Sequence, residues 1–390
     1  MASEFKKIIN SLFSVSDRNL IKEKEKNLRR VVEDERERRR KPYGLPYYIN
    51  IETSRQCNLT CRMCPFHSSP ENRKKWGVSS GIMDEDVFVR IAKQLFPFLK
   101  TCALSVTGEF TLTEYLPTVF ELLEKYSVKF DGFTNGMELT ADVCRMMMPH
   151  LECLTVSVDS PDPVIYEYIR RGAKWSKLLE NVNALMKVRE NIKVVPRPRL
   201  DMQAVLMLAT IETLPALVRL AKDMGFDLVK GVHLGVFSED MVNESLLRHR
   251  ELYNQKREEA IAIAGEVGIE ILLPPPLKEK TASLEQRGAP PQMGCEFLWR
   301  RSFINYDGTV FACCHPKPPL VGNLTGATFE QIWRGFAYSE LRRRIFTDNP
   351  HPSCAKCWIR AGDIPAGREE EYLFESFTIF SKVWGLCSYL

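Results

Sequence analysis

The stretch YYINIETSRQCNLTCRMC, residues 47–64, joins a short β-rich run to three closely spaced cysteines, Cys57, Cys61 and Cys64. A structural zinc site takes four protein ligands and disulfides use cysteines in pairs, so three cysteines complete neither. Thiolates are soft ligands that suit zinc and iron–sulfur clusters. A four-iron cluster held by three cysteines keeps one iron open to a small molecule. The spacing therefore predicts a metal centre with one open coordination position.

The composition is that of a soluble globular protein, with 44% apolar and 27% charged residues in 390. This length suits a barrel with a smaller second domain. No run of eighteen apolar residues is present, and the N-terminus lacks the features of a secretory signal. We therefore expect a cytoplasmic protein, whose twelve cysteines are metal ligands and thiols rather than disulfides.

The positive charge is concentrated at the start of the chain. Residues 1–41 hold thirteen Lys or Arg and eight Asp or Glu, an excess of five in a chain whose net charge is +4. The remaining residues are close to neutral. This distribution argues against nucleic acid as a partner.

From residue 46 onward, β-rich runs alternate with helical patterns, which is typical of parallel strands joined by crossover helices. We expect an α/β fold with six strand–helix units, a partial (β/α)6 barrel, whose active site lies at the carboxyl ends of the strands. The expected strands are 47–53, 103–109, 129–135, 153–159, 199–207 and 228–234.

We divide the chain into five parts: a helical arm (1–45), the barrel (46–272), a proline-rich linker (273–293), a small cysteine-bearing domain (294–365) and an aromatic helical tail (366–390). In the arm, Leu28, Val31 and Val32 are expected on one side of a helix. The arm and the tail have two interpretations: helices packed on the body of the protein, or surfaces for peripheral membrane or partner contact.

The sequence resembles the radical S-adenosylmethionine (SAM) superfamily through the Cys57-x3-Cys61-x2-Cys64 spacing and its Cys-Asn-Leu flank. In that family the three cysteines bind a [4Fe–4S] cluster at the end of the first barrel strand. The open iron binds SAM, and one electron then releases a 5′-deoxyadenosyl radical. The position before the third cysteine is usually aromatic and touches adenine. Here it is Met63, which is soft and apolar.

The resemblance also implies SAM contacts at the ends of later strands. TGEF (107–110) stands where the family has Gly-Gly-Glu, so Gly108 and Glu109 are expected to meet the SAM amine. The remaining residues expected to contact SAM or the substrate are Asn135 in TNG, Ser157 and Asp159 in SVDS, Arg171 in RRGA and Gln203 in RLDMQ.

The small domain holds a second set of cysteines: Cys295, Cys313, Cys354 and Cys357. FINYDGTVFACC predicts a β-hairpin turning at Asp-Gly, and adjacent Cys313 and Cys314 should point to opposite faces of its strand. The domain resembles the SPASM/Twitch extension of radical SAM enzymes, and we favour the Twitch form with one auxiliary [4Fe–4S] cluster on these four cysteines. Zinc is the alternative for such a set.

The resemblance implies a radical SAM enzyme that takes hydrogen from a small-molecule substrate, such as a sugar or aminoglycoside, and oxidises or epimerises it. The electron donor would be reduced ferredoxin or flavodoxin. Cys314, beside a cluster ligand, is a candidate hydrogen donor with packing as the alternative interpretation, while Cys153 is expected to be a packing thiol. The other thiols outside the cluster sets are Cys102, Cys144 and Cys387.

Three alternatives to a small-molecule oxidoreductase or epimerase stay open. The substrate is a peptide held by the barrel, or a lipid-linked molecule taken at a membrane surface. The third alternative is a non-enzyme, an iron–sulfur electron-transfer or scaffold protein.

Overall fold

The seven strands β1 to β7 form a parallel sheet in which neighbours follow chain order. This computed structural model describes residues 15–75, 79–105, 107–194, 196–277, 295, 297–314, 318–355 and 357. The strands are β1 (Tyr48–Ile51), β2 (Thr101–Ala103), β3 (Lys129–Thr134), β4 (Leu151–Ser157), β5 (Arg199–Leu206), β6 (Leu228–His233) and β7 (Glu270–Leu272). Helices follow each of the first six, so the expected partial (β/α)6 barrel is confirmed, with β7 as an additional short strand.

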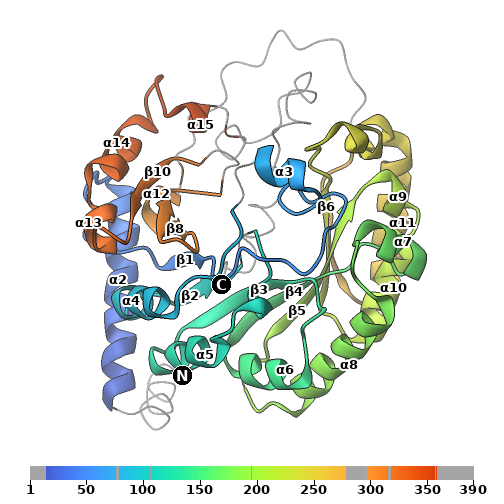
Figure 1. Ribbon diagram of the computed structural model, residues 1–390, viewed down its shortest axis with the longest axis horizontal. Coiled ribbons are helices and arrows are strands. Elements are labelled where there is room, and N and C mark those ends of the chain that lie inside the picture. The colour runs from blue at the N-terminus through green and yellow to red at the C-terminus, as the bar shows by residue number, and fades with distance from the viewer. Residues whose placement is uncertain are drawn as a thin grey trace.

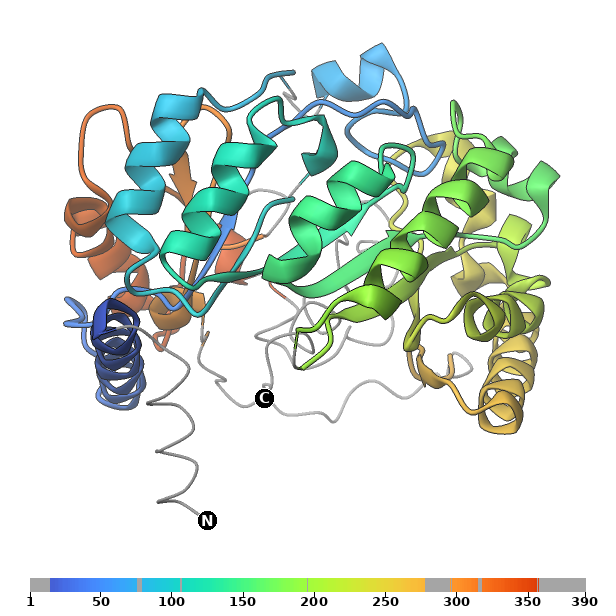
Figure 2. The same ribbon diagram turned by 90° about the horizontal axis from the view of Figure 1, so that it is seen from below.

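The larger helices lie outside the curved sheet and cover its convex face (Figures 1 and 2). They are α4 (Glu85–Leu95), α5 (Leu116–Lys125), α6 (Ala141–Met147), α8 (Trp175–Asn191), α10 (Leu214–Met224) and α11 (Arg250–Val267). The shorter helices are α3 (Pro70–Lys75), α7 (Pro163–Ile169), α9 (Leu208–Ile211), η1 (Phe110–Leu112), η2 (Met148–His150), η3 (Glu239–Glu244) and η4 (Leu246–Arg248).

The two faces of the sheet differ in chemistry. Successive side chains of a strand point to opposite faces, so each strand contributes to both. The helix-covered face is apolar and belongs to the main core, which includes Ile49, Ile51, Phe130, Leu154, Val156, Leu200, Met202 and Val229. The alternate positions include apolar residues such as Ala103, Leu228 and Val232, but most are polar and buried: Tyr48, Asn50, Asp131, Cys153, Thr155, Asp201, Gln203 and Lys230. We call this second set the polar face.

The C-terminal domain extends the same sheet. Its elements are α12 (Phe297–Arg300), β8 (Arg301–Ile304), β9 (Thr309–Phe311), β10 (Leu320–Asn323), α13 (Phe329–Trp333), α14 (Phe336–Arg344) and α15 (Pro352–Ala355). The predicted hairpin is present as β8 and β9, and Gly308 in its turn has a φ of 79° that suits glycine. Since β8 pairs in parallel with β1, the whole forms one ten-stranded sheet.

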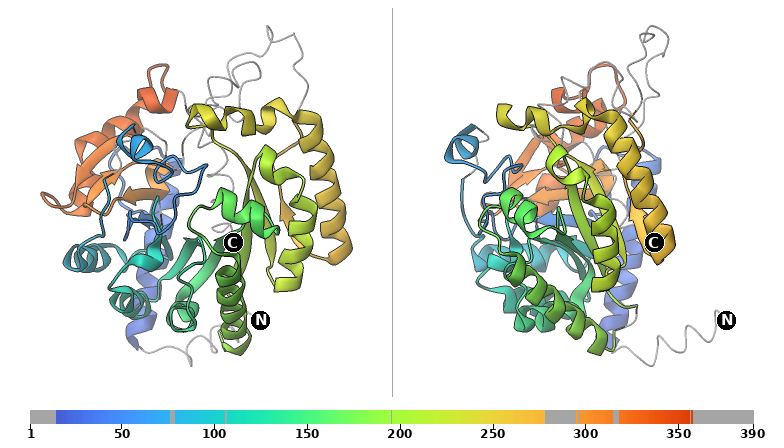
Figure 3. Two further views of the ribbon diagram at one scale, coloured as in Figure 1. Left: turned by 45° about the vertical axis from the view of Figure 1, so that its right-hand side comes forward. Right: turned by 90° about the vertical axis from the view of Figure 1, so that its right-hand side faces the viewer.

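The helical arm is a helix packed on the body of the protein. Helix α2 (Val15–Arg36) lies beside the C-terminal elements, at the opposite end of the sheet from α10 and α11 (Figures 1 and 3). Asn27 exchanges hydrogen bonds with the Leu45 backbone (2.8 and 2.9 Å), and buried Asp34 accepts one from the Gly44 N–H at 2.7 Å. Residues 1–14 of the expected arm lie outside the described residues.

Two local expectations are wrong. Val31 is buried, but Leu28 and Val32 are 44% and 53% exposed, because the helix turns its polar Asn27 and Asp34 toward the protein instead. Strand β2 ends at Ala103 rather than near residue 109, and Glu109 caps the short helix η1.

The predicted linker is described only over residues 273–277, and the aromatic tail (366–390) lies outside the described residues. The hydroxyl of Tyr253 on α11 donates to the Pro274 carbonyl at 2.7 Å, so the start of the linker follows that helix. Among the described helices, none combines the length and the apolar character needed to cross a bilayer.

Candidate functional site

The three-cysteine loop, residues 57–64, leaves the carboxyl end of β1 and is tied to the end of α7. The backbone N–H of Thr60 donates to the Arg171 carbonyl, and that of Arg62 donates to the Ile169 carbonyl, both at 2.9 Å. The motif RRGA therefore positions the cysteine loop through its backbone.

The thiols of this loop fit an iron–sulfur cluster. Burial raises the pKa of Cys57 to about 11 and that of Cys61 to about 12, and it also raises the pKa of Cys64. The backbone N–H of Leu59 donates to the Cys57 sulfur, and that of Phe66 to the Cys64 sulfur. Buried sulfurs with N–H donors are the surroundings in which iron–sulfur proteins hold thiolates and tune their clusters.

A single metal ion is not what this loop is arranged for. Among the described residues, no three His, Cys, Asp or Glu side chains gather closely enough to hold one ion. The cysteines of a four-iron cluster each bind a different iron, so they are spaced more widely.

Glu109 is buried beside this loop. Its carboxylate accepts hydrogen bonds from the Asn135 N–H at 2.8 Å and the Thr111 hydroxyl at 2.9 Å. Burial raises the pKa of Glu109. The Asn135 amide donates to the Asn58 side chain at 2.7 Å and lies 3.9 Å from the Cys57 sulfur. Two of the expected SAM contacts, Glu109 and Asn135, are therefore brought together next to the first cysteine.

Gly108 permits a close approach of two loops. A Cβ at this position would lie 2.3 Å from the Ser54 carbonyl oxygen and 2.7 Å from the Arg55 Cα. The next residue, Glu109, donates its N–H to the Gln56 carbonyl at 2.8 Å. A glycine at 108 therefore lets the loop after β2 lie directly against the start of the cysteine loop.

Asp159 faces the site together with an arginine that the sequence reading did not choose. Arg170 is buried and pairs with Asp159 through its Nε at 2.9 Å, and its Nη1 lies 4.0 Å from the Cys61 sulfur. Asp159 also accepts the Val205 N–H at 2.8 Å. The side chain of Arg171 is exposed. The two consecutive arginines indicated that an arginine lies in the site. Which of them faces the site depends on the direction of the backbone after α7, which the sequence does not reveal.

Ser157, Gln203 and Met63 lie near the same end of the sheet. Ser157 and Gln203 are register partners on β4 and β5. Met63 is half-buried and packs against a small apolar cluster that contains Met207 and Val236. These placements are compatible with the predicted contacts, which stay predictions.

In the C-terminal domain, burial and the nearby charges of Cys357 and Cys354 raise the pKa of Cys295. Burial and Cys357 also raise the pKa of Cys314 to about 11, while Cys313 lies close enough to Tyr338 to raise the pKa of its phenol. No described cysteine is in a disulfide. The structure therefore groups Cys295, Cys354 and Cys357 and brings Cys314 near Cys357, whereas Cys313, the expected fourth ligand, lies near Tyr338.

A buried carboxylate that sequence reasoning missed links the two cysteine-bearing parts. Glu52, at the end of β1, accepts hydrogen bonds from Arg55 Nε at 2.7 Å and from the Thr107 N–H at 3.2 Å. The Arg55 guanidinium lies 5.0 Å from the ring of Tyr306 in the hairpin turn, and that ring's hydroxyl donates to Ser79 at 2.7 Å. The available sequence signal for this site was a charged residue, Glu52, directly after the first β-rich run.

Cys153 is buried, as expected of a packing thiol, but it lies on the polar face rather than in the main apolar cluster. Its sulfur donates to Asp201 at 3.2 Å on the polar face, and the same carboxylate pairs with Lys230 at 2.5 Å. Cys102 and Cys144 do lie in the main apolar core.

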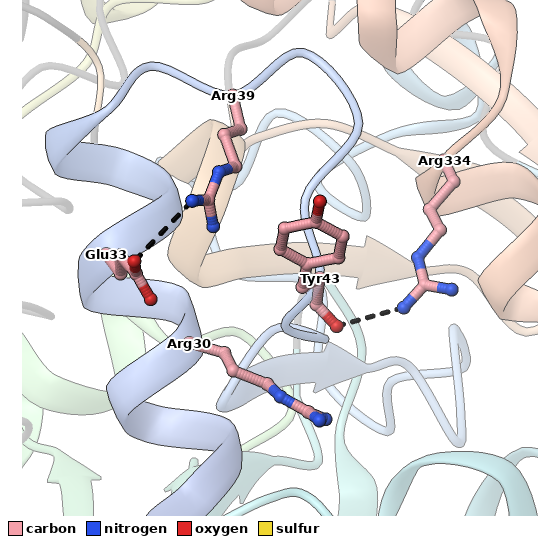
Figure 4. A pocket seen from close by; sticks show the side chains of 5 residues that line it. All are labelled: Arg30, Glu33, Arg39, Tyr43 and Arg334. Carbon is pink, nitrogen blue, oxygen red and sulfur yellow. Dashed lines mark hydrogen bonds and ion pairs between the residues drawn. The ribbon is translucent and has the colours of Figure 1, made fainter.

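A surface pocket of about 380 Å³ lies between α2 and α13 (Figure 4). It is lined by Arg30, Glu33, Arg39, Tyr43 and Arg334. Two of its three arginines make structural contacts: Arg39 pairs with Glu33 at 3.5 Å, and Arg334 donates to the Tyr43 carbonyl at 2.9 Å. None of the predicted site residues lines it.

Comparison with known proteins gives two family matches. Residues 51–198 match the model of the Radical SAM superfamily, and residues 295–358 match the SPASM model, an iron–sulfur cluster-binding domain. The first match begins in β1 and ends just before β5, and the second spans Cys295 to Cys357.

Two curated relatives match most of the chain. The tungsten-containing aldehyde ferredoxin oxidoreductase cofactor-modifying protein of Pyrococcus furiosus is 23% identical over 337 residues, 80% of this chain and 87% of the relative. A probable GTP 3′,8-cyclase of Aeropyrum pernix is 24% identical over 318 residues, 75% of this chain and 82% of the relative.

Two solved structures share the fold. Native anSMEcpe with bound AdoMet has a TM-score of 0.60 and 17% identity, covering 88% of this chain and all (100%) of that chain. SuiB of Streptococcus suis bound to S-adenosylmethionine has a TM-score of 0.58 and 13% identity, covering 86% and 77%.

Proposed function

We propose that this chain, which belongs to the radical SAM superfamily and carries a C-terminal SPASM domain, takes a hydrogen atom from a small polar molecule and completes an oxidation or an epimerisation. Its cofactors are a SAM-binding [4Fe–4S] cluster, SAM and an auxiliary cluster. The substrate class and the reaction subtype are the proposal. The radical chemistry is supported by the buried Glu109 carboxylate beside the three-cysteine loop, and the substrate class by the curated relatives.

At the first site, Cys57, Cys61 and Cys64 hold the cluster. When bound, the cluster and SAM supply the 5′-deoxyadenosyl radical. Glu109 accepts hydrogen bonds from the SAM amine, and Asn135 holds Glu109 in place through its backbone N–H. Because the site is buried, these bonds are stronger than they would be in water.

The remaining predicted contacts of SAM and the substrate come from the cysteine loop and from the ends of later strands. Met63 packs near adenine, while Ser157, Asp159 and Gln203 face SAM or the substrate from β4 and β5. Arg171 stays a predicted contact of the SAM carboxylate, although its exposed side chain makes Arg170 the better placed arginine.

At the second site, Cys295, Cys313, Cys354 and Cys357 hold one auxiliary [4Fe–4S] cluster. Held by these cysteines, the cluster would supply an acceptor for the one electron that leaves the substrate radical in an oxidation. In an epimerisation, a thiol would give the substrate radical a hydrogen atom and become a thiyl radical, which one electron from the reduced ferredoxin or flavodoxin and one proton from solvent would return to the thiol. We propose Cys314 for this role because it lies near Cys357.

The names of the two curated relatives, a cofactor-modifying protein and a GTP cyclase, favour a small molecule over a peptide. A sugar or aminoglycoside is our proposed class. Peptide modification is the second candidate, because SuiB, which shares the fold, was solved bound to a precursor peptide. We place the enzyme in the cytoplasm, where reduced ferredoxin or flavodoxin supplies electrons.

The test is anaerobic reconstitution with iron and sulfide, followed by dithionite and SAM. Release of 5′-deoxyadenosine supports the enzyme, and its absence supports an iron–sulfur scaffold or electron carrier. Cys61→Ala should abolish release, and retained release would contradict the assignment of this loop.

Metal analysis tests the second cluster. Two four-iron clusters predict about eight irons per chain, whereas about four irons with zinc would refute the auxiliary cluster. Cys354→Ala should lower the iron content toward four, while Cys102→Ala, in the apolar core, should keep it unchanged.

A further inference from the structure

Three buried side chains on the polar face carry polar atoms without partners. Asn50, Thr155 and Gln203 are 1%, 0% and 5% exposed. Both amide atoms of Asn50, the Thr155 hydroxyl and the Gln203 carbonyl oxygen make no hydrogen bond. Most buried polar groups in folded proteins are paired, because an unpaired one lowers stability. Several such atoms on one surface indicate a ligand that forms hydrogen bonds with them.

Thr155 and Gln203 are close neighbours on this face. Thr155 on β4 is the register partner of Asp201 on β5, and Gln203 follows Asp201 by two residues. With strands about 4.8 Å apart and about 3.3 Å per residue, the two positions are separated by about 8 Å along the sheet. One ring-sized ligand spans that distance.

Asn50 belongs to the same face through the register of the first four strands. Asn50 pairs with Ala103, Ala103 with Asp131, and Asp131 with Cys153. Side chains of paired residues in a parallel sheet point to the same side, and Thr155 lies two residues beyond Cys153. The sheet curves, with β1, which carries Asn50, on one side and β6 on the other (Figure 1).

The charged groups of the polar face already have partners. Lys230 and Asp201 are both fully buried and lie 2.5 Å apart, and Arg199 approaches Asp201 at 3.1 Å. The Tyr48 hydroxyl donates to Asp131 at 3.0 Å. The atoms that need a partner are therefore the neutral amides and the hydroxyl.

This pattern discriminates between ligand classes. A charged group placed here would add a buried charge beside charged side chains that already have partners, which is costly. An apolar group would leave the amides and the hydroxyl without partners. A hydroxyl donates one hydrogen bond and accepts others, so it satisfies both the donor and the acceptor atoms present.

We infer that the polar face binds an uncharged, hydroxyl-rich ring of the substrate, such as a hexose or cyclitol unit, through Asn50, Thr155 and Gln203. This inference rests on the proposed function and narrows its substrate class. Ser157 and Gln203 lie nearest the carboxyl ends of their strands, so the ring occupies the face below the SAM site.

The first experiment measures thermal unfolding of the reconstituted protein at a fixed scan rate. Thr155→Val keeps the shape but removes an unpaired hydroxyl, so the unfolding midpoint should rise by about 1–3 °C. Thr113→Val is the matched control: this residue is also buried, but its hydroxyl donates to Thr53 at 2.8 Å, so its midpoint should fall. A fall for Thr155→Val equal to that of the control would overturn the inference.

The second experiment adds probes to the reconstituted protein with SAM. Millimolar myo-inositol, a neutral cyclitol, should raise the midpoint by at least about 1 °C, and gluconate or tetra-alanine should not. The myo-inositol shift should disappear in Thr155→Val. No shift, a larger shift with gluconate or the peptide, or a shift that persists in the variant would each overturn the inference. Release of 5′-deoxyadenosine by the wild-type protein tests the proposed function separately and is unaffected by these outcomes.

Discussion

Replacement of Gly108 by alanine tests whether the loop after β2 truly rests on the cysteine loop. The added methyl group would lie 2.3 Å from the Ser54 carbonyl oxygen and 2.7 Å from the Arg55 Cα. Both obstacles are backbone, so no side chain can rotate away. The two loops must separate by about 1 Å to reach ordinary contact distance, since carbon atoms pack at about 3.5 Å or more.

The free-energy cost follows from two terms. Overpacking of this kind costs about 1–3 kcal/mol. The hydrogen bond from the Glu109 N–H to the Gln56 carbonyl, now 2.8 Å, weakens or breaks and adds about 1 kcal/mol. We expect Gly108→Ala to lower the free energy of unfolding by about 2–4 kcal/mol. Because Glu109 moves with the loop, SAM affinity should fall about tenfold to a hundredfold.

The assay is urea unfolding of anaerobically reconstituted protein, with SAM binding measured by equilibrium dialysis. Gly265→Ala is the control, because this residue lies within helix α11 and its added methyl group meets no atom within 4 Å. The control should gain about 0.5–1 kcal/mol from helix propensity. If Gly108→Ala unfolds within about 0.5 kcal/mol of the wild type and binds SAM equally well, the reasoning about loop contact is refuted.

Three further predictions concern buried charged groups. Arg170→Met leaves the Asp159 carboxylate buried without its counter-ion, so urea unfolding should show a loss of about 3–5 kcal/mol, and adding Asp159→Asn should recover part of it. Burial lowers the pKa of His233 to about 4. Between about pH 6.5 and 4, the unfolded chain therefore binds a proton that the folded chain does not. The free energy of unfolding should fall by up to about 3 kcal/mol as the pH drops through this window. Urea unfolding of His233→Phe should lack this part of the pH dependence. Arg342→Met removes a buried guanidinium that donates to the Trp333 carbonyl at 2.7 Å, and a loss below about 1 kcal/mol in urea unfolding would contradict its structural role.

The strand–helix alternation and the cysteine spacing were readable because both are local signals. Hydrophobic periodicity located five of the six expected strands within about two residues, and the Asp-Gly pair located the hairpin turn. Strand β2 was misplaced because the stretch after Ala103 is β-rich in composition but has other partners. The Thr107 N–H bonds to the Glu52 carboxylate rather than to a strand, which is a tertiary contact that composition does not reveal.

In two places the sequence did not reveal which of several neighbouring side chains faces the interior of the protein. Arg170 and Arg171 are identical in type, and only the backbone direction at the end of α7 turns Arg170 toward Asp159. In α2, polar contacts of Asn27 and Asp34 set the rotation of the helix, so a hydrophobic pattern alone gave the wrong side.

Cys153 is different, because the signal was present in the sequence. In LECLTVSVD, residues 151–159, Cys153 alternates in phase with Thr155 and Ser157, whereas Leu154, Val156 and Val158 form the apolar series. A period of two places the thiol with the polar series. The structure agrees, since Cys153 donates to Asp201 outside the apolar core.

The parallel pairing of β8 with β1 has a consequence for how the chain can be divided. If the polypeptide were cut before residue 295, β1 would become an unprotected margin whose amide and carbonyl groups invite association with other molecules. A shortened barrel should therefore be prone to self-association, and the SPASM segment serves as the cover of that margin as well as the carrier of cysteines. Transplanting either part onto another scaffold would need a replacement strand at the seam.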